Sequence, residues 1–366
     1  MSELKTNKIS TNDGNNVAID NAIGLKTYTT EQKNGLTSVA GDLIFDTDLG
    51  KAQIHDGSSW GDIGQTDRAL DIDFLVVAGG GSGYWSYGGG GGAGGYRSSW
   101  NNETSGGGAS SETAHIVAAG QDYTVSVGGG GSTAGAGGVM GNDSRFAGVT
   151  SLKGGAAKAG AGYAGGSGGG GRHSSHLGGA GEPGQGYRGG NANGVAGTSN
   201  GGGGGGAGGQ GTDSITQYGA AGGPGQKSTI ITTTQATTYS VGEVSGSDVY
   251  YAGGGGGGLY RADPPSLGRK GAGGIGGGGD GGINSAAGNQ LSAQSATTNT
   301  GGGGGGQGNG GSAAGSGGSG VVILKWLTAL ATIGATRTGL TDSGVQTDGD
   351  YSYIIFTQGT GSVSFS

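Results

Sequence analysis

Apolar residues in this chain gather in short runs, and the long stretches between the runs carry very few of them. Residues 74–77 form a continuous apolar run that leads directly into glycines. Residues 123–127 alternate apolar and polar positions before another glycine run, and residues 321–324 follow the last one. Short apolar runs beside turn-forming residues are typical of strands. We therefore expect these runs to form a common β base from which the glycine-rich stretches extend.

The first 68 residues have a different pattern, with more charge and more ordinary apolar residues. A short helix is expected to begin at Thr29. Residues 43–45 and 52–55 are expected to pair as a β-hairpin around a turn at residues 48–50. Residues 1–68 are therefore predicted to be a separate N-terminal module.

Two further segments interrupt or follow the glycine-rich domain, which we place at residues 69–326. Residues 227–251 are rich in Thr, β-branched and aromatic residues, which favour strands, and they predict a β-hairpin or a projecting loop. Residues 327–366 return to a strand pattern and predict a C-terminal β segment, with its clearest strands at residues 351–356 and 362–365.

Glycine dominates the composition, with 102 of 366 residues, whereas about 7% is usual. Only 4 prolines and no strict G-X-Y period are present, which excludes collagen. Glycine brings no side chain to a core and loses much backbone freedom on folding, so main-chain hydrogen bonds must stabilise such a domain. Polyglycine II helices are left-handed, threefold and without internal hydrogen bonds, so neighbouring helices can satisfy one another.

The predicted fold is therefore mostly β and irregular: an N-terminal β-hairpin module, then a polyglycine II lattice on a β base, with very little α-helix. Helices of about 6 to 12 residues would be about 20 to 40 Å long.

Charge and cysteine content exclude several classes of function. The net charge is -7 and only 12% of residues are charged, which disfavours a nucleic-acid partner. The chain has no Cys for disulfides or thiolate sites, and no apolar run long enough for membrane insertion. The chain begins without the apolar core of a signal peptide.

Motifs for catalysis and metal binding are weak. The matches to G-x-G-x-x-G lack the strand and helix that a dinucleotide site needs, and no nucleophile elbow of the G-x-S-x-G type occurs. The spacing of His173 and His176 could place two imidazoles on a metal, but no third ligand follows. We expect no enzyme activity, no cofactor and no metal.

The order of four sequence blocks is distinctive: FLVVAGGGSG from residue 74, GGGGGAGGYRSS from residue 88, YTVSVGGGG from residue 123 and GGSGVVILKW from residue 317. Over about residues 71–326, this succession resembles the glycine-rich domain common in tail-fibre and related virion proteins of phages. The GDLIFDTDLGKAQIHDGSSW segment is similar to a short hairpin of such proteins. The architecture also resembles that of tail-tip adhesins built from polyglycine II helices.

This resemblance implies a phage tail-fibre or fibre-tip protein, a homotrimer in the virion tail, made in the host cytoplasm and exposed outside the host cell. Its N-terminal module, residues 1–68, would serve attachment or oligomerisation and would bind other virion tail proteins. Loops of the lattice would bind host-surface polysaccharide or an outer-membrane protein.

Aromatic and basic residues between the glycine runs are the candidates for receptor binding. Aromatic faces suit sugar rings and Arg suits acidic sugars or phosphate, but the same residues could cover the lattice edge or a seam between subunits. The candidates are Tyr84, Trp85, Tyr87, Tyr96, Arg97, Trp100, Arg172, His173, His176, Tyr187, Arg188, Tyr250, Tyr251, Tyr260 and Arg261.

Two other functions remain open at this stage. The chain could be a purely structural decoration fibre or a self-assembling extracellular filament, in which the C-terminal segment pairs with a neighbouring subunit. A flat polyglycine II face could also bind ice.

Overall fold

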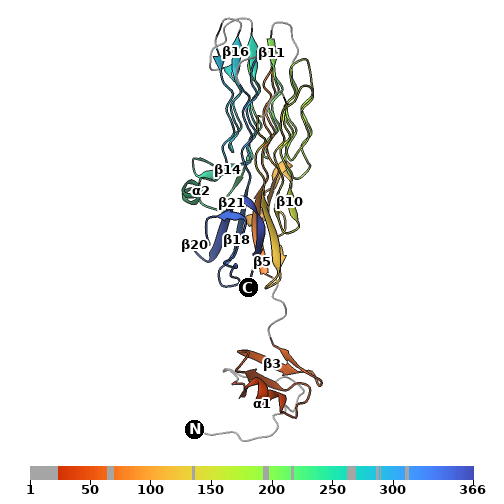
Figure 1. The fold of residues 1–366 in the computed structure, drawn as a ribbon, viewed down its shortest axis with the longest axis vertical. Coiled ribbons are helices and arrows are strands. Elements are labelled where there is room, and N and C mark those ends of the chain that lie inside the picture. The colour runs from red at the N-terminus through yellow and green to blue at the C-terminus, as the bar shows by residue number, and fades with distance from the viewer. Residues whose placement is uncertain are drawn as a thin grey trace, which may run out of the picture. The chain divides into compact units, whose positions relative to one another are not determined.

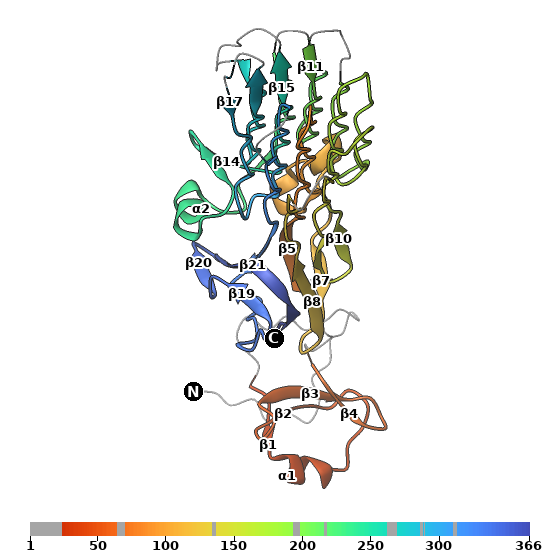
Figure 2. The ribbon, with the colours of Figure 1, turned by 45° about the horizontal axis from the view of Figure 1, so that its top comes forward.

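The chain divides into two compact units, residues 1–68 and residues 69–366. The structure is a computed structural model, shown in Figures 1 and 2. The residues that it describes are 24–63, 70–133, 137–192, 198–215, 218–261, 269–285, 288, 290–309 and 313–366.

The first unit contains a four-stranded sheet and one short helix. Its elements are β1 (Thr27–Tyr28), α1 (Thr30–Asn34), β2 (Leu43–Asp46), β3 (Lys51–His55) and β4 (Trp60–Asp62). The sheet order is β1-β2-β3-β4, and β2 and β3 form the antiparallel hairpin. Helix α1 begins after Thr29, which forms a capping box with Gln32. The predicted helix start and hairpin are both confirmed.

A buried ion pair joins the helix to the sheet of this unit. The carboxylate of Asp46 lies 2.9 Å from the Lys33 Nζ. It also accepts hydrogen bonds from the Thr30 hydroxyl and from the backbone N–H groups of Asp48 and Leu49. Burial raises the pKa of Asp46, but the hydrogen bonds from Lys33, Leu49 and Thr30 outweigh it and lower the pKa to about 2.

The second unit stands on a ten-stranded sheet, which is the predicted β base (Figure 2). Its strands are β5 (Leu70–Val77), β6 (Tyr96–Ser98), β7 (His115–Val117), β8 (Asp122–Val127), β9 (Ser144–Phe146), β10 (Val149–Ser151), β18 (Val321–Leu327), β19 (Leu340–Asp342), β20 (Gln346–Asp348) and β21 (Tyr351–Ser364). The order is β10-β9-β8-β21-β18-β5-β6, while β7 also pairs with β5, and β19 and β20 pair with β21. Two 3-10 turns, η1 (Trp100–Asn102) and η2 (Gly106–Gly108), follow β6.

The central strands β5, β18 and β21 are buried on both faces. Phe74 and its neighbours at alternate positions belong to one hydrophobic cluster, together with Phe356. Leu75 points to the other face and joins a second cluster, with Ile323 and Ile355. A strand covered on both faces has a continuous apolar sequence. This burial explains why the apolar runs in β5 and β18 are unbroken.

Strand β21 merges the two strands predicted at residues 351–356 and 362–365 into one. It pairs with β18 along one edge of its first half, and with β20 and β19 along the other. Its second half pairs with β8. The C-terminal segment therefore completes the sheet within its own chain.

The glycine-rich stretches form the predicted lattice, and the hydrogen bonds show its threefold period. In residues 88–95, the N–H groups of Gly88, Gly91 and Gly94 all donate to one neighbour, residues 301–307, at 2.8–2.9 Å. The other N–H donors of this segment reach two more segments, and three further segments donate to its carbonyl groups. The six neighbours are residues 78–84, 152–155, 167–170, 202–205, 255–258 and 301–307. Segment 88–95 therefore lies at the centre of a hexagonal array of polyglycine II helices.

Close approach of the backbones makes glycine necessary in this segment. A Cβ atom added to Gly91 would lie 2.0 Å from the carbonyl oxygen of Gly81, and one added to Gly90 would lie 2.0 Å from that of Gly255. Ala93 is tolerated because its side chain joins the hydrophobic cluster above the base. A side chain at Gly90 or Gly91 would therefore collide with the backbone of a neighbouring helix.

Residues 227–251 differ from their prediction. They contain β12 (Gln226–Ser228), helix α2 (Thr233–Tyr239), β13 (Glu243–Ser245) and β14 (Asp248–Tyr251), and the strands form a separate three-stranded sheet. The predicted hairpin is present as β13–β14, but the Thr-rich part is helical. Thr232 and Gln235 form a capping box at its start, which outweighs the strand preference of threonine. In the described residues no helix is long and apolar enough to cross a membrane.

Candidate functional site

The end of the lattice far from the base carries short strands, and we call it the distal end. These strands are β11 (Thr198–Asn200), β15 (Leu259–Arg261), β16 (Ile283–Ser285) and β17 (Gln290–Leu291), which form one sheet. Figures 1 and 2 show β11 at the opposite end of the second unit from β5.

Three sequence-distant candidates meet at the distal end. The ring of Tyr87 contacts His173 at 4.7 Å and Tyr260 at 5.2 Å between ring centroids, both edge to face. The backbone supports this contact, because the His173 N–H donates to the Tyr87 carbonyl at 3.2 Å. Tyr87 sits in the turn that reverses the chain, with φ of 49°, and Tyr260 lies in β15. The lattice therefore assembles one aromatic cluster from residues far apart in sequence.

Arg172 ties a second turn to this cluster. Its Nε donates to the Ser86 carbonyl at 3.0 Å, and its guanidinium lies 5.5 Å from the ring centre of Tyr84. Tyr84 is buried and packs at 6.2 Å from Trp85, which remains 38% exposed. The guanidinium is thus held in place by a ring and a carbonyl, neither of which neutralises its charge.

Local burial sets the protonation of the cluster. Burial lowers the pKa of His173, and the charges of Arg172 and His176 lower it further. Burial also raises the pKa of Tyr87. At neutral pH both rings are therefore uncharged, and the cluster's charge comes from Arg172.

His176 turns toward the backbone. Its Nδ1 is 2.7 Å from the carbonyl oxygen of His173. No group of three His, Cys, Asp or Glu side chains that could hold a metal occurs in the part of the chain that the structure describes.

Sequence reasoning missed two further pairs of a cation and a tyrosine at this end. The Lys158 Nζ lies 4.0 Å from the ring centre of Tyr163, and the Arg269 guanidinium lies 5.4 Å from that of Tyr218. Tyr163 is 39% exposed and Tyr218 47%. Each of these residues is an aromatic or basic residue beside a glycine run, which is the pattern that marked the other candidates. They lie outside the three clusters of candidates named from the sequence.

Two candidates are buried, so their prediction as receptor contacts is wrong. Tyr96 and Tyr251 are both 0% exposed and fill the second hydrophobic cluster. The Tyr96 hydroxyl donates to the Lys227 carbonyl at 3.2 Å. Burial raises the pKa of both hydroxyls, with a smaller contribution from nearby Glu103. Tyr250, the neighbour in β14, is half-buried in the separate three-stranded sheet.

Arg97 and Trp100 lie at the base and not in a distal loop, because β6 pairs with β5. The Arg97 Nε donates to Glu112 at 2.7 Å. Trp100 packs edge to face on Tyr351 at 5.3 Å. Both residues therefore connect parts of the base. This is closer to the alternative role given above, in which such side chains cover an edge of the lattice, than to receptor binding.

The remaining candidates are Tyr187, Arg188 and Arg261. Tyr187 and Arg188 lie in a lattice segment, and the Arg188 guanidinium is 3.6 Å from Asp213. Arg261 lies in β15, and its side chain is outside the described residues.

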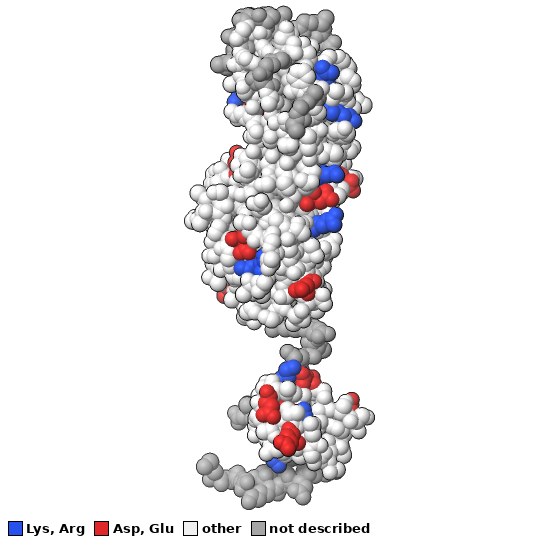
Figure 3. All heavy atoms as spheres, in the orientation of Figure 1, with Lys and Arg blue, Asp and Glu red and all other residues white. Residues whose placement is uncertain are grey.

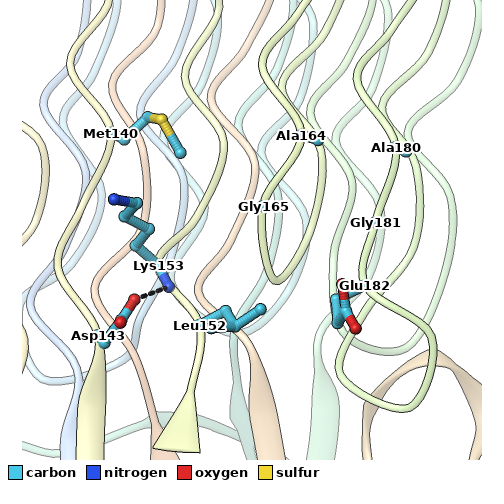
Figure 4. A pocket seen from close by; sticks show the side chains of 9 residues that line it. All are labelled: Met140, Asp143, Leu152, Lys153, Ala164, Gly165, Ala180, Gly181 and Glu182. Carbon is cyan, nitrogen blue, oxygen red and sulfur yellow. Dashed lines mark hydrogen bonds between the residues drawn. The ribbon is translucent and has the colours of Figure 1, made fainter.

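An open groove of about 420 Å³ lies on the side of the lattice (Figure 4). The Asp143 carboxylate accepts a hydrogen bond from the Lys153 backbone N–H at 2.9 Å on one side, and Glu182 lies on the other. The lining residues are Met140, Asp143, Leu152, Lys153, Ala164, Gly165, Ala180, Gly181 and Glu182. No aromatic ring lines this groove, and its charges have both signs, so it lacks the features of the distal cluster.

Comparison with known families matches residues 59–327 to the glycine-rich domain. The match covers more than half of the chain and agrees with the span of about 71–326 expected from the four sequence blocks. No curated protein matches the chain. The hydrogen-bonded lattice on its β base and the family match lead to one conclusion: this chain belongs to the glycine-rich domain family.

Proposed function

We propose that the chain is a phage tail-fibre or fibre-tip protein whose distal end binds the surface of the host cell. One observation carries this proposal: turns that are far apart in sequence bring Tyr87, His173 and Tyr260 together at the end of the lattice opposite the β base. Aromatic rings and Arg are the side chains that contribute most to binding surfaces.

The lattice suits this role because it is stiff. Its backbone groups bond to several neighbours at once, so the distal turns are held before a ligand arrives. A preorganised surface loses less conformational entropy on binding than a flexible loop does. In our proposal the first unit attaches the fibre to other tail proteins, three chains form the fibre, and no catalysis is involved.

The alternative of a filament built by the C-terminal segment is less well supported. Strand β21 pairs with β18 over residues 351–356 and with β8 over residues 359–364, while β20 and β19 pair with it between residues 351 and 359. The edge that such a filament would use is therefore already occupied.

Adsorption competition tests the proposal. The purified chain, incubated with host cells, should reduce the adsorption of particles that carry it, and antibodies against the chain should label the tail fibres. Replacing two exposed distal side chains, Trp85→Ser and Tyr163→Ser, should abolish the competition. The matched control replaces two exposed side chains of the base, Ile116→Ser and Leu327→Ser, and should compete normally.

Substitutions are preferable to loop deletions here. A deletion of residues 84–100 would remove the central helix of the lattice as well as the turn. If the wild-type chain does not bind host cells and antibodies do not label the tail, the proposal is wrong.

A further inference from the structure

The distal end carries three cations that pair with no carboxylate of the described residues. Lys158, Arg172 and Arg269 each lie over a tyrosine ring, at 4.0, 5.5 and 5.4 Å from the ring centres. Among the described residues none of the three forms an ion pair with Asp or Glu. A cation over an aromatic face keeps its charge and can still bind an anion.

Two carboxylates toward this end, among the residues that the structure describes, are already engaged. Asp213 accepts a hydrogen bond from the Asn191 N–H at 2.7 Å and lies 3.6 Å from Arg188. Asp280 pairs with Lys270 and accepts a hydrogen bond from the Gly273 N–H. On the face drawn in Figure 3, the distal part of the second unit shows Lys and Arg, while Asp and Glu appear nearer the base. On this face the described distal residues thus show positive charge, in a chain of net charge -7.

Contacts connect the three cations into one row. The Arg172 N–H donates to the carbonyl of Gly160, in the turn between Lys158 and Tyr163. From Arg172 the row continues through the cluster of Tyr87, His173 and Tyr260.

The second half of the row runs through the distal sheet. Tyr260 in β15 pairs with Ser199 in β11. The adjacent Asn200 side chain donates to the carbonyls of Ile215 and Tyr218, and Tyr218 lies beneath Arg269. Lys158 and Arg172 therefore lie toward one end of the row and Arg269 at the other, with Tyr87, Tyr260 and Tyr218 between them.

We propose that this row binds an anionic polysaccharide, with tyrosines against sugar rings and Lys158, Arg172 and Arg269 against carboxylate or phosphate groups. The inference rests on the proposed function and names the ligand class of the same distal end. An extended polymer with a charge on each repeat matches a row of separated cations better than a single small anion does. The pairing of flat rings with cations is the chemistry that acidic sugars require.

Binding of the full chain to defined polymers tests this inference. Polygalacturonate presents carboxylates and polyribitol phosphate presents phosphates, so the two arms separate the sources of charge. Fully methyl-esterified polygalacturonate is the matched neutral ligand. We expect binding to at least one anionic polymer, weakening as salt rises, and no binding to the ester.

A triple variant, K158Q, R172Q and R269Q, should bind about tenfold more weakly at low salt, since three charge contacts are lost. The control removes three exposed cations elsewhere: K26Q, R145Q and K227Q. Both variants should keep the melting temperature of the parent chain. A variant with R172K and R269K keeps all three positive charges, so it should bind nearly as strongly as the parent chain.

Equal binding by the two triple variants would overturn the inference, as would absence of binding to both anionic polymers. Binding to the neutral ester as strong as to polygalacturonate would also overturn it, because the rings alone would then suffice. If the chain still binds host cells in these cases, and protease treatment of the cells removes that binding, the adhesin proposal stands with a protein receptor.

Discussion

Substitution of one central glycine tests how tightly the lattice is packed. In Gly91→Ala, the new Cβ would lie 2.0 Å from the Gly81 carbonyl oxygen, whereas 3.4 Å is an ordinary contact. The two helices would have to separate by about 1.4 Å, or the residue would have to leave its place. The alanine side chain is small and apolar, so this clash is the main destabilising effect of the substitution.

The expected cost follows from the hydrogen bonds between these two helices. The Gly81 N–H donates to the Gly92 carbonyl at 2.9 Å and the Tyr84 N–H donates to the Gly89 carbonyl at 3.2 Å, so these bonds join the two helices that must separate. A shift of more than 1 Å breaks both bonds in a dry interior, at about 1 to 3 kcal/mol for each unpaired group. We therefore expect a loss of about 4 kcal/mol in the free energy of unfolding. For a large domain this lowers the melting temperature by about 10 °C.

Thermal unfolding followed by circular dichroism measures this effect. The control is Gly148→Ala, at an exposed turn where a Cβ would meet nothing within 4 Å. That variant should melt at the parent temperature or slightly above it, because Ala restricts the unfolded chain. If the two variants melt within 2 °C of each other, the close packing described for the lattice is refuted.

Two further predictions concern polar groups in the two units. The lowered pKa of Asp46 means that its contribution to stability is present above about pH 4 and is lost as the pH falls toward 2. Asp46→Asn should remove this pH dependence from the hydrogen-exchange rates of β2 and β3. If these rates depend on pH between 4 and 2 in the variant as they do in the parent chain, the role assigned to Asp46 is wrong. Buried Lys325 donates to the Ile230 carbonyl at 2.9 Å and lies over Trp100, so Lys325→Met should make the segment around α2 more sensitive to protease. Exposed Lys227→Met is its control, and equal cleavage of both variants would contradict the anchoring role.

The β base and the lattice could be predicted from the sequence for clear physical reasons. Strands buried on both faces need unbroken apolar runs, which β5 and β18 have. Glycine runs have no side chains to pack, so hydrogen bonds between the main chains of neighbouring helices must stabilise them. The helix α2 departs from the predicted strand because the capping box at Thr232 outweighs the strand preference of the threonines.

The position of each candidate side chain could not be predicted, because it depends on where each helix turns. Tyr87 and Tyr96 are nine residues apart, which at about 3.1 Å per residue is about 28 Å along a polyglycine II helix. One lies at the distal end and the other in the core of the base. Likewise, the contact of Tyr87 with His173 and Tyr260 depends on which helices are neighbours, and the glycine runs are too alike to specify this.

Amide hydrogen exchange of residues 88–95 tests the central claim most directly. If six neighbouring segments satisfy this helix, its glycine amides should exchange as slowly as those of the central strand β18, although no helix or sheet of the usual kind contains them. Exchange of these amides at the rate of an unstructured glycine peptide would contradict the lattice.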